Sequence, residues 1–260
     1  MIKAVFFDID GTLVPFESKR CLPSTKQALE QLRQRGILTF VATGRARLEM
    51  ERAGFLTGMH FDGYITANGQ YCYSEEKVYY EDPIPRTDVE NLYHYLQSND
   101  CACFFMEEDA SYLNRVNQRV EDIFAQLHTP VPPVAPLERI LQHKLYQIAA
   151  YVPHQQEEIF LQLMPGCKAT SWHPLELDLL PRSGGKMPAI QATLKHFSLR
   201  PEEIMAFGDG KNDRDMVAFA GIGVAMGDGA ESVKAAADYV TTPAAQDGIA
   251  LALRRFGLID

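Results

Sequence analysis

Near the N-terminus, the apolar run Ala4–Phe7 leads into two aspartates, Asp8 and Asp10, and a glycine, Gly11. An unbroken apolar run of this length is typical of a strand that is buried on both faces of a parallel sheet. Ligands of open parallel sheets bind at the carboxyl ends of the strands. Because residues two apart in an extended chain point the same way, Asp8 and Asp10 are expected to face one small site. The same residue types also form ordinary turns after strands, so this stretch alone leaves a plain turn open.

Two carboxylates that close repel each other unless a cation or a shared proton lies between them. A hard divalent metal is the simplest solution, and oxygen-rich sites suit Mg²⁺. The pair Asp8 and Asp10 therefore predicts Mg²⁺ as a cofactor.

The composition limits the class of protein. A chain of 260 residues with 46% hydrophobic residues can form one large domain or two modest ones. The net charge of −9 argues against a nucleic-acid partner, because phosphate backbones attract basic surfaces. Five scattered cysteines are typical of reduced thiols, and the first residues lack the pattern of a signal peptide. No apolar stretch approaches the roughly 20 residues that span a bilayer, so we expect a cytoplasmic protein without membrane contact.

The order of apolar runs and amphipathic segments predicts a doubly wound, Rossmann-like parallel sheet of the α/β class. Ser24-x-x-Gln27 has the form of a helix capping box, and a second buried strand is expected over residues 37–42. The alternation resumes late in the chain with a helix over residues 186–197 and a strand over residues 204–207. Strand, helix and strand in this order form the βαβ unit of a parallel sheet.

The middle of the chain has a different pattern of predicted strands and helices. A hairpin is expected over residues 71–80, and the proline-rich segment that begins at Asp82 opens a set of strands and helices, including a helix over residues 114–127. This pattern predicts an α/β cap domain, residues 82–184, inserted into a core that comprises residues 1–81 and 185–260.

Polar residues follow three of the predicted core strands, and a lysine begins the helix that follows the insertion. These residues are Asp8 and Asp10, Thr43, Asp209 with Asn212 and Asp213, and Lys186. Taken singly, each has an ordinary explanation as a turn, a helix cap or a surface lysine. Because the carboxyl ends of parallel strands lie on one edge, their occurrence at four matching positions favours a single site.

Carboxylates around a cation, with one lysine and several small donors, suit phosphoryl transfer, which needs mostly positioning and charge stabilisation. An aspartate can act as a nucleophile and form an aspartyl phosphate. A second aspartate two residues further on can protonate the leaving oxygen and then activate water.

Four motifs together resemble the haloacid dehalogenase superfamily of phosphatases, and within it the Cof type. The first motif of that family matches Asp8–Thr12, and the second, an apolar strand that ends in Thr or Ser, matches Thr43. The third is a lysine, matched by Lys186, and the fourth matches Gly208–Asp213. The insertion between the second and third motifs resembles the larger α/β cap of that family.

The resemblance implies a role for each acidic residue. Asp8 would be the nucleophile and a Mg²⁺ ligand. Asp10 would be the general acid and base, with its backbone carbonyl on the metal. Asp209 would be the third protein ligand, and Asp213 would support the metal site and orient Lys186.

The resemblance also implies a phosphate-binding set. Thr43, the Gly44 amide, Lys186 and Asn212 would hold the phosphoryl oxygens, and Thr43 and Lys186 would therefore share in catalysis. Arg45 stays open between a substrate contact and a surface or capping role.

One departure from the family pattern concerns the third motif, where a glycine usually follows the lysine. Here Met187-Pro188 follows Lys186. Proline is accepted in a first helical turn, but a residue before proline favours extended backbone. The start of this helix and the direction of Lys186 are therefore left open.

The sequence predicts a Mg²⁺-dependent phosphatase that hydrolyses small phosphate monoesters, with sugar phosphates first, through an aspartyl phosphate. Two alternatives remain: a phosphosugar mutase or phosphotransferase with the same intermediate, and a non-catalytic sensor of a phosphorylated ligand. The expected partner is a small phosphorylated metabolite, and the expected assembly is a monomer or a weak homo-oligomer.

Overall fold

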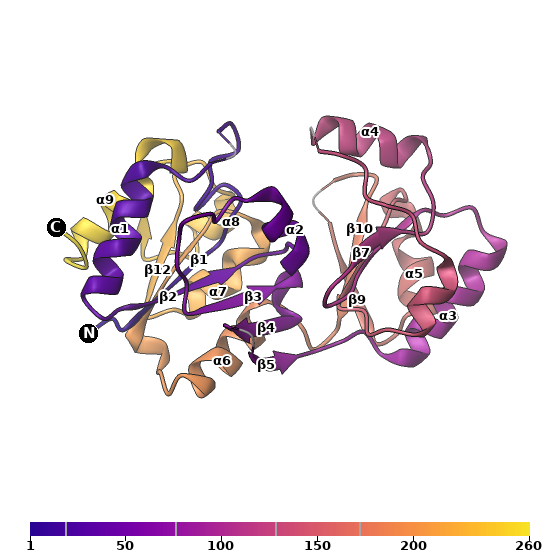
Figure 1. The fold of residues 1–260 in the computed structure, drawn as a ribbon, viewed down its shortest axis with the longest axis horizontal. Coiled ribbons are helices and arrows are strands. Elements are labelled where there is room, and N and C mark those ends of the chain that lie inside the picture. Colours follow the sequence, from indigo (N-terminus) through magenta and orange to yellow (C-terminus); the bar gives the residue numbers. More distant parts are fainter. Residues whose placement is uncertain (19, 76, 128, 172) are drawn as a thin grey trace. The chain divides into compact units, whose positions relative to one another are not determined.

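The structure, a computed structural model, describes residues 1–18, 20–75, 77–127, 129–171 and 173–260. It divides into two compact units (Figure 1). The core unit contains residues 1–45, 50–81 and 185–260, and the inserted unit contains residues 46–49 and 82–184. None of the described helices is both long enough and apolar enough to cross a membrane.

Within the described residues, the core unit contains an eight-stranded sheet in the order β13-β12-β11-β1-β2-β3-β4-β5. The six strands from β13 to β3 pair in parallel, whereas β4 and β5 are antiparallel and form the expected hairpin. Residue 76 of that hairpin lies outside the described residues. The strands are β1 (Ala4–Phe7), β2 (Leu38–Ala42), β3 (Gly63–Thr66), β4 (Tyr71–Ser74), β5 (Lys77–Glu81), β11 (Ile204–Gly208), β12 (Ile222–Ala225) and β13 (Tyr239–Val240). The predicted parallel α/β sheet is confirmed.

Helices cover both faces of the sheet, as the apolar run in β1 requires. Val5 and Phe7 pack with apolar residues of α1 and α9, which lie side by side in Figure 1, whereas Ala4 and Phe6 pack with residues of α6. All four strand residues are fully buried. The helices of this part of the chain are α1 (Pro23–Gln34), α6 (Lys186–His196), α7 (Arg214–Phe219), α8 (Glu231–Lys234) and α9 (Gly248–Arg255). Helix α2 (Arg47–Ala53) has its first three residues in the inserted unit and the rest in the core unit.

The start of α1 differs from the expected capping box. The helix begins at Pro23, and Leu22 occupies the N-cap position without a side-chain cap. Ser24 is therefore inside the first turn, where its hydroxyl donates a hydrogen bond to Asp247 Oδ1 at 2.5 Å. The proline, whose fixed φ suits the first helical position, sets the helix start instead of the serine.

The inserted unit contains, among its described residues, a five-stranded sheet in the order β7-β6-β8-β10-β9. Every pairing in that order is antiparallel. The strands are β6 (Cys103–Met106), β7 (Ser111–Leu113), β8 (Gln147–Ala150), β9 (Cys167–Thr170) and β10 (Leu177–Pro181).

One apolar cluster joins this sheet to two helices, α3 (Arg86–Ser98) and α5 (Glu157–Leu163). Helix α4 (Gln118–Gln126) is shorter than the expected segment 114–127. The side chain of Asn117 accepts a hydrogen bond from the Val120 amide at 3.2 Å and caps the helix, which begins at Gln118, four residues later than predicted.

Candidate active site

The pairing register of the core sheet brings distant residues to one edge. Phe7 of β1 lies between Val41 of β2 and Phe207 of β11. Asp8, Thr43 and Asp209 each follow one of these three residues by one or two positions. The carboxyl ends of three neighbouring parallel strands therefore carry the polar residues that the sequence singled out.

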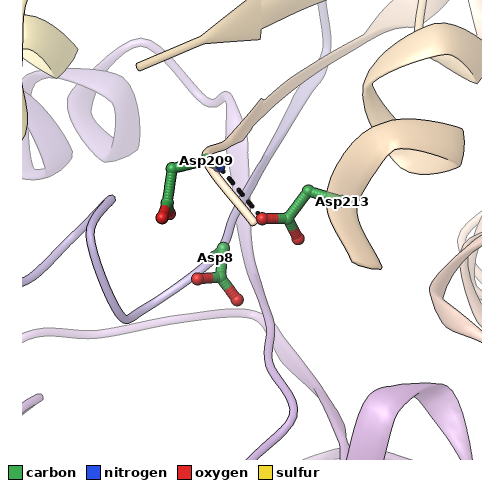
Figure 2. A group of neighbouring side chains, drawn as sticks. All are labelled: Asp8, Asp209 and Asp213. Atoms are coloured by element: carbon green, nitrogen blue, oxygen red, sulfur yellow. Dashed lines mark hydrogen bonds between the residues drawn. The ribbon is translucent and has the colours of Figure 1, made fainter. Parts of the chain in front are cut away.

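Three buried carboxylates gather at this edge. Asp8, Asp209 and Asp213 each present one oxygen, and these oxygens lie within 4.8 Å of one another (Figure 2). Their exposed fractions are 6%, 8% and 0%, so water screens their repulsion poorly. Three negative charges in so small a volume need compensation.

Lys186 supplies part of that compensation from the first residue of α6. Its ammonium group donates to Asp8 Oδ1 at 2.6 Å and to Asp213 Oδ1 at 2.5 Å. The side chain is 1% exposed. This lysine is therefore a buried partner of two carboxylates, and the surface alternative for it is wrong.

The helix start at Lys186 is compatible with Met187-Pro188. Gly185 occupies the N-cap position with φ at 134°, a backbone region that L side chains rarely adopt. Pro188 falls in the first helical turn, where a backbone N–H has no intrahelical partner in any case. The proline therefore costs the helix no hydrogen bond, and the glycine provides the entry angle.

Two further oxygens of this group accept hydrogen bonds, one on Asp213 and one on Asp209. Asp213 Oδ2 accepts hydrogen bonds from the amides of Asp209 at 3.0 Å and Gly210 at 2.9 Å. Thr12 donates its hydroxyl hydrogen to Asp209 Oδ1 at 2.7 Å. A Cβ at Gly11, whose φ is +78°, would collide with the Asp209 carboxylate, which explains the glycine in the first motif.

The charges shift the proton affinities strongly. Burial raises the pKa of Asp8 well above its usual value, Lys186 opposes that rise, and Asp213 and Asp209 add to it. Burial and the neighbouring Asp213 raise the pKa of Asp209 to about 7. Burial lowers the pKa of Lys186, but Asp213 and Asp8 outweigh it, so the net change is upward. One lysine therefore does not balance the group when all three carboxylates are ionised.

This donor set fits a hard divalent cation. The group consists of carboxylate oxygens, which Mg²⁺ prefers, and its excess of negative charge matches a positive ion. Of the predicted metal ligands, Asp8 and Asp209 are in the group. Asp213, predicted as a supporting residue, lies in it too, but both of its oxygens already bind Lys186 or backbone amides.

The Asp10 side chain is held differently from Asp8. Arg45 donates from Nε to Asp10 Oδ2 at 2.7 Å and from Nη2 to Asp10 Oδ1 at 2.8 Å. The same guanidinium lies 4.7 Å from the centre of the Phe55 ring. The arginine that the sequence left open is therefore a bidentate partner of Asp10, a geometry that specifies both position and orientation.

Among the predicted phosphate-binding residues, the Thr43 hydroxyl accepts a hydrogen bond from the Arg45 amide at 3.2 Å. Two others, Gly44 and Asn212, share a neighbour that was not predicted from the sequence, Asn68. The Asn212 side chain donates to Asn68 Oδ1 at 2.9 Å, and a Cβ at Gly44 would lie 3.1 Å from the same oxygen. In the sequence Asn68-Gly69 is typical of an ordinary turn, and nothing local relates it to residues 44 and 212.

A doubly wound sheet with buried carboxylates and a lysine at its carboxyl edge defines an α/β enzyme of the phosphoryl-transfer type. The chain belongs to the haloacid dehalogenase-like hydrolase family, which it matches over residues 5–253. The Cof-type resemblance of the four motifs is confirmed, and the chain is a phosphatase of this superfamily.

Individual relatives extend over the whole chain. A protein of Bacillus subtilis named "Putative phosphatase YkrA" is 30% identical over 99% of this chain and 98% of its own length. The structure of the phosphatase BT1666 from Bacteroides thetaiotaomicron has 33% identity and a TM-score of 0.90, and the match covers 100% of this chain and 96% of that one. The structure of BT4131, described as a subclass IIB sugar phosphatase, has 38% identity and a TM-score of 0.84. The match covers 99% of this chain and 100% of that one.

Proposed function

We propose that this enzyme hydrolyses small phosphate monoesters with Mg²⁺ as cofactor, and that sugar phosphates are its preferred substrates. The observation that carries the proposal is the buried group of Asp8, Asp209 and Asp213 with Lys186 between two of its members. The similarity to BT4131 supports sugar phosphates, because that protein is described as a sugar phosphatase.

In the first proposed step, an oxygen of Asp8 attacks phosphorus and forms an aspartyl phosphate. The bond between phosphorus and the ester oxygen breaks, and Asp10 donates a proton to that leaving oxygen. Lys186, 2.6 Å from Asp8, holds the nucleophile in place and offsets the negative charge of the incoming phosphoryl group.

In the second proposed step, Asp10 takes a proton from water as the water oxygen attacks phosphorus. The bond between phosphorus and Asp8 breaks, inorganic phosphate leaves, and Asp10 is protonated for the next cycle. Arg45, which holds both oxygens of Asp10, would fix the orientation of this carboxylate between steps.

Asp8 and Asp209, with the backbone carbonyl of Asp10, are the proposed protein ligands of Mg²⁺, and Asp213 supports them. When bound, the ion would offset repulsion between carboxylates and phosphate and polarise the phosphoryl group. On the phosphate side, Thr43, the Gly44 amide, Lys186 and Asn212 are the proposed donors to the phosphoryl oxygens.

A phosphate-release screen tests the proposal. The purified chain is incubated with hexose, pentose and triose phosphates, FMN and pyridoxal phosphate, in Mg²⁺ or in EDTA. We expect release of inorganic phosphate that EDTA abolishes and added Mg²⁺ restores, with sugar phosphates turned over fastest. Equal release in EDTA would contradict the metal dependence, and an isomerised sugar phosphate in place of free phosphate would identify a mutase.

A further inference from the structure

We propose that Asn68 is a positioning residue, which sets the phosphate-binding side of the site by holding Asn212 and packing against Gly44. The inference rests on the proposed phosphatase function. It concerns a three-residue turn, η1 (Ala67–Gly69), between β3 and β4.

The turn contacts all three segments that carry proposed phosphate-binding residues. Toward the segment after β2, the Asn68 amide donates to Thr43 O at 3.0 Å and the Ala67 amide donates to Arg45 O at 2.9 Å. Toward the segment after β11, the Asn68 side chain accepts from Asn212 Nδ2 at 2.9 Å.

The third contact is with the start of α6. A Cβ at Gly69 would collide with the carbonyl of Gly185 and lie 3.0 Å from the Lys186 amide. The turn therefore packs directly against the peptide that leads into the lysine of the site. Only a glycine permits this close approach.

The backbone of the turn is unusual, which points to a role beyond reversing the chain. Ala67, Asn68 and Gly69 all have positive φ, at 49°, 54° and 98°. Two of the three are not glycine, and a left-handed conformation is unfavourable for residues with a Cβ, although asparagine tolerates it better than alanine. Strain of this kind persists where surrounding contacts enforce it, often at functional sites.

The contact with Asn68 fixes the orientation of the Asn212 amide. One hydrogen of the Asn212 NH₂ group binds Asn68 Oδ1, and a Cβ at Gly210 would lie 2.6 Å from Asn212 Oδ1, so that oxygen faces Gly210. An amide nitrogen has two hydrogens, so a second one stays available for a phosphoryl oxygen. Asn212 is an exposed residue, and without Asn68 its side chain would sample several rotamers.

The test is a double-mutant cycle on the full chain with Asn68→Gly, Asn212→Ala and the combined variant. The readouts are KM for p-nitrophenyl phosphate, the inhibition constant of inorganic phosphate, and Tm. Glycine adopts the left-handed backbone without cost, so Asn68→Gly removes the acceptor oxygen but not the turn.

We expect Asn68→Gly to weaken inhibition by inorganic phosphate roughly 3- to 10-fold, the loss that one hydrogen bond typically carries, without lowering Tm. Asn212→Ala should give a similar loss, and the combined variant should lose less than the product of the two single losses, because the two residues act through a shared contact. Ser198→Gly is the matched control, since Ser198 also has a positive φ, of 55°, but lies two residues beyond the C-terminal end of α6. It should leave phosphate inhibition and KM unchanged.

An inhibition constant for Asn68→Gly within twofold of the wild-type value would overturn the inference, as would losses that multiply in the combined variant. In either case the wild type still hydrolyses p-nitrophenyl phosphate, and the proposed function stands. A wild type that releases no phosphate from any monoester overturns both.

Discussion

Both units of this chain contain buried acidic residues, but these residues have different surroundings in the two units. In the parallel core sheet, strands distant in sequence are neighbours, so Asp8, Asp209 and Lys186 meet at one edge. In the inserted unit, two buried acidic residues on or beside the antiparallel sheet accept hydrogen bonds from a neutral amide and from an arginine: Gln147 donates to Asp178 at 2.6 Å, and Arg139 donates to Glu107 at 2.9 Å.

The comparison teaches that a buried carboxylate by itself says little about chemistry. Asp8 and Asp178 are both buried, and burial is the main cause that raises the pKa of each. Asp8 stands in a group with two further carboxylates and a lysine, whereas hydrogen bonds with Glu176 and Gln147 offset only part of the rise in the pKa of Asp178, which stays above its usual value. The first arrangement has an excess of negative charge that a cation can balance, whereas Asp178 has its hydrogen-bond partners within the protein.

The largest expected difference in turnover is between two single variants that carry the same conservative change, one in each unit. Asp8→Asn should lower turnover roughly 10⁴-fold or more, because an amide oxygen is a poor nucleophile, while Tm stays close to the wild-type value. Asp178→Asn, the matched control, should change kcat for p-nitrophenyl phosphate by less than about 10-fold, since an amide oxygen still accepts from Gln147. Steady-state kinetics on both variants make the comparison, and equal losses would break it.

The next effect concerns the partner of Asp10. Arg45→Lys keeps the positive charge but loses the two parallel hydrogen bonds, and we expect kcat to fall roughly 10-fold with little change in Tm. The pH dependence of kcat is the second readout, because a less constrained Asp10 would alter it whereas a purely structural defect would not. Unchanged kcat and pH dependence would show that Arg45 does not position the acid and base.

A change to the charge pair of the inserted unit should affect stability instead of turnover. Glu107 is buried and binds Arg139 and the Tyr112 hydroxyl. Arg139→Met leaves that carboxylate without its charged partner, which should lower the free energy of unfolding by about 1–3 kcal/mol. Urea denaturation measures the loss, and Arg33→Met, which removes an exposed pair with Glu30 on α1, is the control with little expected change. A loss of turnover in Arg139→Met greater than its loss of folded protein would contradict the prediction that this pair affects stability and not turnover.

The smallest expected effect is a pH dependence of stability at the start of β11. Hydrogen bonds from Arg200 and Lys3 lower the pKa of Glu203 from 4.5 to about 2. Because the folded pKa is lowered, the charged form stabilises the fold above pH 4.5, and this contribution disappears as the pH falls toward 2. Glu203→Gln should therefore have a lower Tm than the wild type at neutral pH, and the difference should shrink as the solution is acidified. A difference that grows in acid would contradict this sign.

Much of the core could be predicted from the sequence because its signals are local. The run Ala4–Phe7 is apolar at every position since helices cover both faces of β1, and such runs identify central strands of parallel sheets. The convergence of Asp8, Thr43 and Asp209 then follows from the common direction of the strands. The helix start at Pro23 was missed because the capping-box pattern ignored the proline beside it.

The contacts of single side chains could not be predicted in the same way. Asn68 and Asn212 are separated by 144 positions, so no spacing rule connects them. Arg45 follows Thr43 by two residues, yet its direction toward Asp10 depends on how the loops after β1 and β2 lie in space. In the inserted unit, an antiparallel sheet offers no common strand edge, and polar residues there carry no comparable positional signal.

The most direct test of the central claim is a crystal structure of the chain grown with Mg²⁺ and beryllium fluoride, a stable mimic of a phosphoryl group on a carboxylate. The account predicts a beryllium–oxygen bond to Asp8, with Lys186 beside the fluorides and Mg²⁺ bound by Asp8 and Asp209. An adduct on another carboxylate, or none on Asp8 in a crystal that holds both ions, would contradict it.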